Sequence, residues 1–155
     1  MTKYTTAALL CLLTTFLSAS DGPPVSVESR AKGAQLVVVA AVENVHSRFG
    51  ANQYGDQVIL SDVQLDVAET LKGRANTPLT VTVEGGRIGE LALHVSDMPV
   101  MQPGERAVFF LDGAASGFVL HERGLGVMKI DANEHVRDTT LTVDDVRRSV
   151  RAVAK

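Results

Sequence analysis

The sequence predicts a mainly β protein, a small closed or partly open antiparallel barrel with one C-terminal helix. Short stretches rich in valine and leucine recur along the chain, and several of them alternate apolar and polar residues, the period of a β-strand with one wet face. Glycine or proline separates these stretches. Apolar residues recur at helical spacing only near the C-terminus. Closing the sheet into a barrel would remove exposed strand edges.

The first twenty residues have the features of an export signal. Lys3 precedes an apolar run from Ala7 to Leu17, and the small residues Ser18-Ala19-Ser20 follow it. The run is shorter than the roughly 20 apolar residues that span a bilayer, which disfavours an uncleaved anchor. A lipid anchor on Cys11 is disfavoured because this cysteine lies in the middle of the run. We expect residues 1–20 to be a cleaved signal peptide and the mature protein to be periplasmic or secreted.

Composition limits the classes of partner. Cys11 is the only cysteine, so the mature chain is disulfide-free and its core alone must stabilise it. The net charge is −3, whereas nucleic acids and anionic membrane surfaces require concentrated positive charge. No later apolar run is long enough to cross a membrane. We expect no nucleic-acid partner and no transmembrane anchor in the mature chain.

Residues 21–33 are predicted to form a polar lead-in, and residues 34–131 the barrel domain. The valine-rich run Leu36–Val42 is expected to be a buried strand. Residues 47–57 contain two glycines and an asparagine, which is typical of a long hairpin loop.

The next strand has the clearest alternation. Val63, Leu65 and Val67 fall on one face, whereas Val58 and Leu60 have the opposite phase. This change of phase predicts a β-bulge near Ser61.

The following strands are shorter. Residues 79–84 alternate again, Gly85-Gly86 is expected to form a tight turn, and residues 91–95 a return strand. Further strands are expected at residues 106–111, 118–120 and 126–130.

Residues 132–155 are expected to form a C-terminal segment with a helix at about 143–153. Thr142 can cap it, and Val143, Val146, Val150 and Val153 form one apolar stripe. Asp144 and Arg148, four residues apart, are expected to pair.

Catalytic and metal-binding patterns are lacking. The mature chain has no cysteine and no Gly-x-Ser-x-Gly turn, and its four histidines do not have the spacings that place two ligands on one metal. We predict a non-enzymatic protein without a metal or cofactor. The alternative is a weak hydrolase that uses His94 or His121 as its base.

Three segments resemble a known family. Residues 33–42, the strand that ends at Lys72-Gly73, and residues 103–111 resemble OB-fold modules of tissue inhibitors of metalloproteinases and netrin-like domains, and small exported bacterial proteins of similar pattern. The resemblance implies an OB-like barrel over residues 33–131. Those animal inhibitors grip the protease zinc through an N-terminal cysteine held by disulfides, so no residue of this mature chain inherits that role.

The favoured hypothesis is an exported protein-binding module, with a secreted or envelope protease as one candidate partner. Long loops at residues 47–57 and 85–101 would display the contact surface on a rigid barrel. Tyr54, Arg87 and His94 are the predicted binding residues. The alternative is a barrel that binds a small ligand or oligosaccharide, for which the adjacent Phe109 and Phe110 are the only paired aromatic lining.

Overall fold

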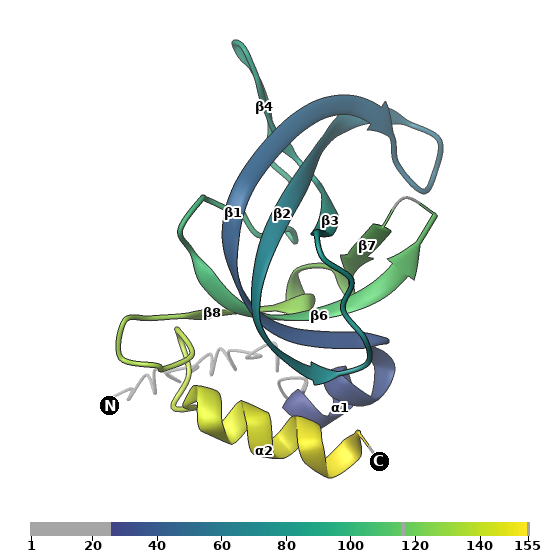
Figure 1. Ribbon diagram of the computed structural model, residues 1–155. Coiled ribbons are helices and arrows are strands. Elements are labelled where there is room, and N and C mark those ends of the chain that lie inside the picture. Colours follow the sequence, from purple (N-terminus) through teal and green to yellow (C-terminus); the bar gives the residue numbers. More distant parts are fainter. Residues whose placement is uncertain (1–25, 116, 155) are drawn as a thin grey trace, which may run out of the picture.

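The computed structural model describes residues 26–115 and 117–154, so the predicted signal peptide lies outside the described residues. Strands form a curved barrel, and two helices lie together below it (Figure 1). The elements are α1 (Val27–Gly33), β1 (Leu36–Ala51), β2 (Gln57–Lys72), β3 (Leu79–Glu84), β4 (Gly86–Ile88), β5 (Leu91–Leu93), β6 (Arg106–Ala114), β7 (Gly117–Leu120), the 3₁₀ turn η1 (Arg123–Gly126), β8 (Val127–Ile130) and α2 (Val143–Val153).

The large sheet closes on itself. β1 pairs with β2, β2 with β3, β3 with β7, β7 with β6, and β6 returns to the first part of β1. All these pairings are antiparallel except the short one between β3 and β7. β8 continues the pairing along β6 beyond β7. The predicted small barrel with a C-terminal helix is therefore confirmed.

Burial on both faces explains the continuous apolar run at the start of β1. Leu36, Val38 and Ala40 point into the barrel, whereas Val37 and Val39 point toward the helices. A strand covered on both sides is apolar throughout instead of alternating. The barrel core consists of Leu36, Val38, Ala40, Val42, Val63, Leu65, Leu79, Val81, Val83, Met101, Ala107, Phe109, Leu111 and Leu120.

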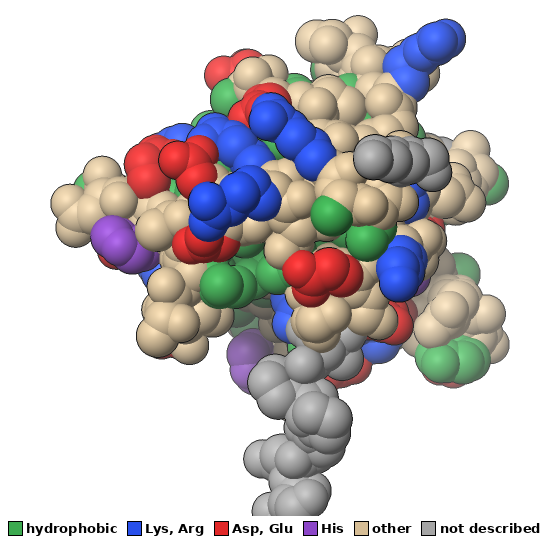
Figure 2. Space-filling model, turned by 90° about the horizontal axis from the view of Figure 1, so that it is seen from below, with side chains coloured by type: hydrophobic (Ala, Val, Ile, Leu, Met, Phe, Trp, Pro, Cys, Tyr) green, Lys and Arg blue, Asp and Glu red, His purple; other side chains and the backbone are tan. Residues whose placement is uncertain are grey.

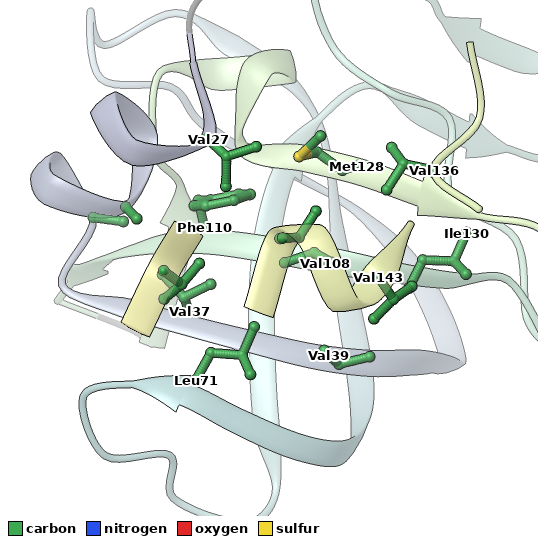
Figure 3. Close-up of a cluster of buried hydrophobic side chains, with 14 residues drawn as sticks. Val27, Val37, Val39, Leu71, Val108, Phe110, Met128, Ile130, Val136 and Val143 are labelled. Atoms are coloured by element: carbon green, nitrogen blue, oxygen red, sulfur yellow. The ribbon is translucent and has the colours of Figure 1, made fainter. Parts of the chain in front are cut away.

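A second core joins the outside of the barrel to the helices. Figure 3 shows Val37, Val39, Val108 and Phe110 gathered beside α2. This helix-side core also contains Val27, Ala31, Ala34, Leu71, Met128, Ile130, Val136, Val143, Val146 and Val150. The adjacent phenylalanines therefore separate, with Phe109 inside the barrel and Phe110 against the helices.

The prediction that only the C-terminus is helical was wrong, because α1 lies within the expected lead-in at residues 21–33. Ser26 caps this helix, since its Oγ accepts a hydrogen bond from the Ser29 amide at 3.1 Å. Val27 and Ala31 lie four residues apart and both are buried. Two apolar residues in an otherwise polar segment were too weak a signal to predict this helix from the sequence.

Lys72 and Gly73 attach α1 to the barrel. The Lys72 Nζ donates hydrogen bonds to the carbonyls of Ala31 at 2.7 Å, Lys32 at 3.2 Å and Ala34 at 2.6 Å. These carbonyls belong to the end of α1, where a positive charge is favourable. Gly73 has φ +79°, and a Cβ there would lie 2.5 Å from the Gln35 carbonyl oxygen. Lys72 and Gly73 thus hold the end of β2 against the end of α1.

The predicted β-bulge near Ser61 is also wrong. Strand pairing is continuous on both sides of Ser61, and the register shifts occur instead at Val37/Val38, Val39/Ala40 and Val42/Asn44 of β1. Ser61 points into the barrel, and Leu60 lies on the other face, where Gly50 leaves it room. Because Ser61 is polar but points inward, the alternation of apolar and polar residues along β2 changes phase in the sequence without a bulge in the strand.

α2 begins with a reciprocal cap. Thr142 Oγ1 accepts a hydrogen bond from the Asp145 amide, and the Asp145 carboxylate accepts hydrogen bonds from the Thr142 hydroxyl and from the Thr142 amide, which hold the pKa of Asp145 below its usual value.

The expected pair between Asp144 and Arg148 does not form. Arg147 bonds Asp144 at 2.6 Å, and Arg148 bonds Asp145. Arg147 also reaches Glu69 of β2 at 2.7 Å and so ties the helix to the barrel. Viewed from the helix side, acidic and basic side chains are intermixed (Figure 2).

Neither helix in the described part of the chain combines the length and apolar character needed to cross a membrane.

The capping of α1 can be tested by the substitution Lys72→Met. We expect a loss of about 1.5–3 kcal/mol in the free energy of unfolding, because three carbonyls lose a charged donor. Denaturant unfolding measures this loss. The exposed Arg74→Met is the control and should change stability by less than about 0.5 kcal/mol. Equal effects of the two substitutions would contradict the capping role.

Candidate functional site

Strands occupy part of both predicted long loops. β1 continues through Ala51, so the first loop is reduced to residues 52–56. β4 and β5 pair to form a projecting hairpin, which we call the arm (residues 86–93). Its turn lies at Gly89-Glu90, not at Gly85-Gly86 as predicted. The Gly85 amide instead donates to the Ile59 carbonyl at 2.8 Å and keeps the chain against β2.

We call the end of the barrel away from α1 and α2 the open end (Figure 1). A cavity of about 400 Å³ lies between the arm and this open end, and we call it the mouth pocket. β1 contributes Val45 and Ser47 to its walls, and β3 contributes Val83. The arm and the following segment, residues 94–101, cover the other side. Ligand sites typically occupy roughly 300–1,000 Å³ and have mainly apolar walls, so the pocket falls within the usual range.

Two serines join the arm to the barrel wall. Ser61 Oγ donates to the Gly85 carbonyl at 2.7 Å and lies 2.9 Å from Ser47 Oγ. Because Ser61 has one hydroxyl proton, Ser47 is the donor in this serine pair. Ser47 Oγ accepts a further hydrogen bond from the Arg87 amide at 3.4 Å. Both hydroxyl protons are therefore used within the protein.

Gly86 allows the arm to approach these hydroxyls. Its φ is +136°, a conformation that side chains disfavour. A Cβ at this position would overlap Ser61 Oγ and lie 2.5 Å from Ser47 Oγ. The glycine is needed for close approach and not for a turn.

Arg123 fixes the segment that forms the far wall. Its Nη2 bonds Asp97 Oδ1 at 3.0 Å and lies 3.4 Å from Glu84 Oε2. The Gly124 amide donates to the Asp97 carbonyl at 3.0 Å. Hydrogen bonding from Arg123 holds the pKa of Asp97 below its usual value, and the same contact raises the pKa of Arg123. Met98, Pro99, Val100 and Met101, which line the pocket, follow directly.

The structure brings together two of the three predicted binding residues. Arg87 and His94 both line the mouth pocket and are exposed. Tyr54 lies apart, at the tip of the β1–β2 hairpin, where its side chain is 76% exposed. The Asn52 side chain organises that tip by accepting hydrogen bonds from the amides of Tyr54 and Asp56, both at 2.9 Å.

Ser47, Ser61 and Gly86 were not predicted to belong to the site. A polar residue within a strand is normally read as facing solvent, and only the unusual Gly-Gly pair could have indicated a close approach.

His121 and His94 differ in their surroundings. His121 Nδ1 lies 2.8 Å from Asp112 Oδ2, but a Cβ at Gly33 would collide with its Nε2. The ring therefore packs against the end of α1, and its side chain is 16% exposed. His94 is exposed and makes no side-chain hydrogen bond within the described ranges. Among residues 26–115 and 117–154, no three metal-ligating side chains come close enough to hold an ion.

Comparison with known proteins gives no relative, since no family model matches the chain and no curated protein is significantly similar to it.

The close approach at Gly86 can be tested by Gly86→Ala. We expect the arm to move off the serine pair, at a cost of about 1–3 kcal/mol in the free energy of unfolding, and the NMR methyl signals of Met98 and Met101 to shift. Gly89→Ala is the matched control, because Gly89 also has positive φ (+57°) but has no atom within 4 Å of the added Cβ. Identical behaviour of the two variants would show that backbone strain alone is responsible.

Proposed function

We propose that the protein is an exported, non-enzymatic binding module that contacts a partner protein with the open end of its barrel. One observation carries this proposal: most of the strongly exposed large apolar side chains lie at this end, on the arm, on the segment that follows it and on the β1–β2 hairpin, although Tyr54 at the hairpin tip lies apart from the mouth pocket (Figure 1). Phe49 is 59%, Tyr54 76%, Leu91 60% and Val100 57% exposed. Single exposed apolar residues are ordinary, but several at one end of a molecule mark an interaction surface.

The open end supports these side chains on connected elements. Phe49 follows Ser47 by two residues on β1, so both point to the same side of the strand. Ser47 contacts the Arg87 amide of the arm, and Leu91 lies near the tip of that arm. Val100 lines the mouth pocket beside the arm. We define Phe49, Leu91 and Val100, together with the predicted residues Tyr54, Arg87 and His94, as the rim.

Contact through the rim is consistent with the energetics of protein interfaces. A few apolar and aromatic anchors carry most of the binding energy, and Arg is enriched among them. The ordered arm and the ordered β1–β2 tip lower the entropy lost on binding. Because of the resemblance to protease inhibitors, a secreted or envelope protease is the first class of partner to test. Its binding would not use a zinc-gripping cysteine, since the mature chain has none.

A second candidate function is binding of a small ligand, which the mouth pocket favours. An oligosaccharide fits this pocket less well, because its walls are mainly aliphatic and sugars need polar partners and aromatic platforms. The two candidate surfaces overlap, because Arg87, His94 and Val100 belong to the rim and also line the mouth pocket.

The rim proposal is tested by affinity capture with immobilised protein, using extracts and culture supernatant of the source organism. The triple variant Tyr54→Ala, Arg87→Ala, His94→Ala should lose a stoichiometric partner, and so should the double variant Phe49→Ser, Leu91→Ser. Each replaced side chain is exposed, so the variants should remain folded.

Leu125→Ser is the matched control, since Leu125 is 45% exposed, is not a rim residue and does not line the mouth pocket, and its carbonyl accepts a hydrogen bond from Arg30. It should retain the partner. Retention by both rim variants, or loss with Leu125→Ser alone, would remove the proposal.

A further inference from the structure

We infer that the mouth pocket binds a small apolar carboxylate, a fatty-acid-like molecule whose alkyl chain fills the cavity and whose carboxylate pairs with Arg87. This inference goes beyond the protein-binding proposal and is tested separately from it, because its readouts are the methyl signals inside the cavity, although Arg87 and Val100 belong to the rim as well.

The size and lining of the cavity favour an alkyl chain. Its volume of about 400 Å³ lies at the low end of the range for ligand sites. Val45, Val83, Leu93, Met98 and Met101 present aliphatic or thioether groups to it. Methionine side chains adapt to flexible apolar ligands, because they are unbranched and polarisable.

The polar groups of the floor are already satisfied. Ser61 donates to the Gly85 carbonyl, Ser47 donates to Ser61, and the Arg87 amide donates to Ser47. A ligand that buried an amide or hydroxyl here would leave it without a partner, which is costly. An alkyl chain has no such requirement. This separates a fatty carboxylate from the end of a peptide chain, which would bring peptide groups into the cavity.

The charge at the pocket favours an anion. Arg87 is exposed, and in the part of the chain that the structure describes its guanidinium has no ion pair. Glu84, the lining carboxylate, is occupied by Arg123 at 3.4 Å. Arg87 is thus the cation at the pocket that remains available, and a guanidinium binds a carboxylate through two parallel hydrogen bonds.

The chain carries its own reporters for a binding experiment. Its four methionines include Met98 and Met101, which line the pocket, and Met128, which lies in the helix-side core. Protein with ¹³C-labelled methionine methyl groups is titrated with decanoate, with 1-decanol, and with saturated carboxylates of increasing chain length, all below their micelle concentrations. A tetrapeptide that ends in leucine with a free carboxylate is titrated in parallel.

We expect decanoate to shift the methyl signals of Met98 and Met101 saturably and to leave that of Met128 unchanged. Affinity should rise about fourfold for each added methylene and level off when the cavity is full. Arg87→Gln should lower the affinity for decanoate about two- to fivefold at low salt and leave the affinity for decanol unchanged. Arg74→Gln, which removes another exposed arginine, should have no effect. Ala92→Trp, at an exposed position that lines the pocket, should abolish binding of both ligands.

Several outcomes would overturn the inference. Unchanged Met98 and Met101 signals at saturating ligand would show that the cavity does not accept alkyl chains. Equal loss of decanoate and decanol in Arg87→Gln would show that the carboxylate is not recognised there. If the peptide bound more tightly than decanoate, the preferred ligand of the pocket would be the C-terminus of a peptide and not a fatty carboxylate. Retained binding in Ala92→Trp would place the ligand elsewhere.

Discussion

The hydrogen-bonded serine pair is the interaction on which the open end of this barrel depends. Ser47 and Ser61 come from neighbouring strands and connect the Arg87 amide to the Gly85 carbonyl, so they join the arm to the barrel wall. Ser61 is only 3% exposed. Moving the arm together with Gly85 away from β2 would break the hydrogen bond of this buried hydroxyl to the Gly85 carbonyl, at a cost of about 1–3 kcal/mol. These hydrogen bonds therefore hold the arm against the barrel, where it forms one wall of the mouth pocket.

The position of the pocket follows from the course of β1. β6 pairs with this strand only as far as Ala41, and the last contacts between the two segments join Val42 to Glu105 and Gly104. Beyond that point β1 leaves the closed ring and continues with β2 as a hairpin. Residues 98–101 and the arm cover the opening. At the other end, α1 and α2 are fixed by the helix-side core and by Lys72, so the two ends of the barrel have different roles.

Most of the barrel could be predicted from the sequence, because alternation and two-sided burial depend directly on side-chain polarity. The errors have local causes. α1 buries only Val27 and Ala31 of its own residues, so its periodicity is weak. Gly85-Gly86 has the sequence of a turn, but Gly86 instead allows the backbone of the arm to lie close to the hydroxyls of Ser47 and Ser61. Arg87 and His94, predicted as binding residues from their position in a loop, line the mouth pocket, and their binding role stays a prediction. The serine pair could not be predicted, since a hydroxyl within a strand gives no sign of facing inward.

A double-mutant cycle between Ser47→Ala and Ser61→Ala tests the central claim most directly. The free energy of unfolding is measured for the wild type, both single variants and the double variant. Because the two hydroxyls are 2.9 Å apart and share one chain of hydrogen bonds, we expect a coupling energy of about 0.5–3 kcal/mol. Effects that add to within about 0.3 kcal/mol would show that the serines act independently and would contradict the claim.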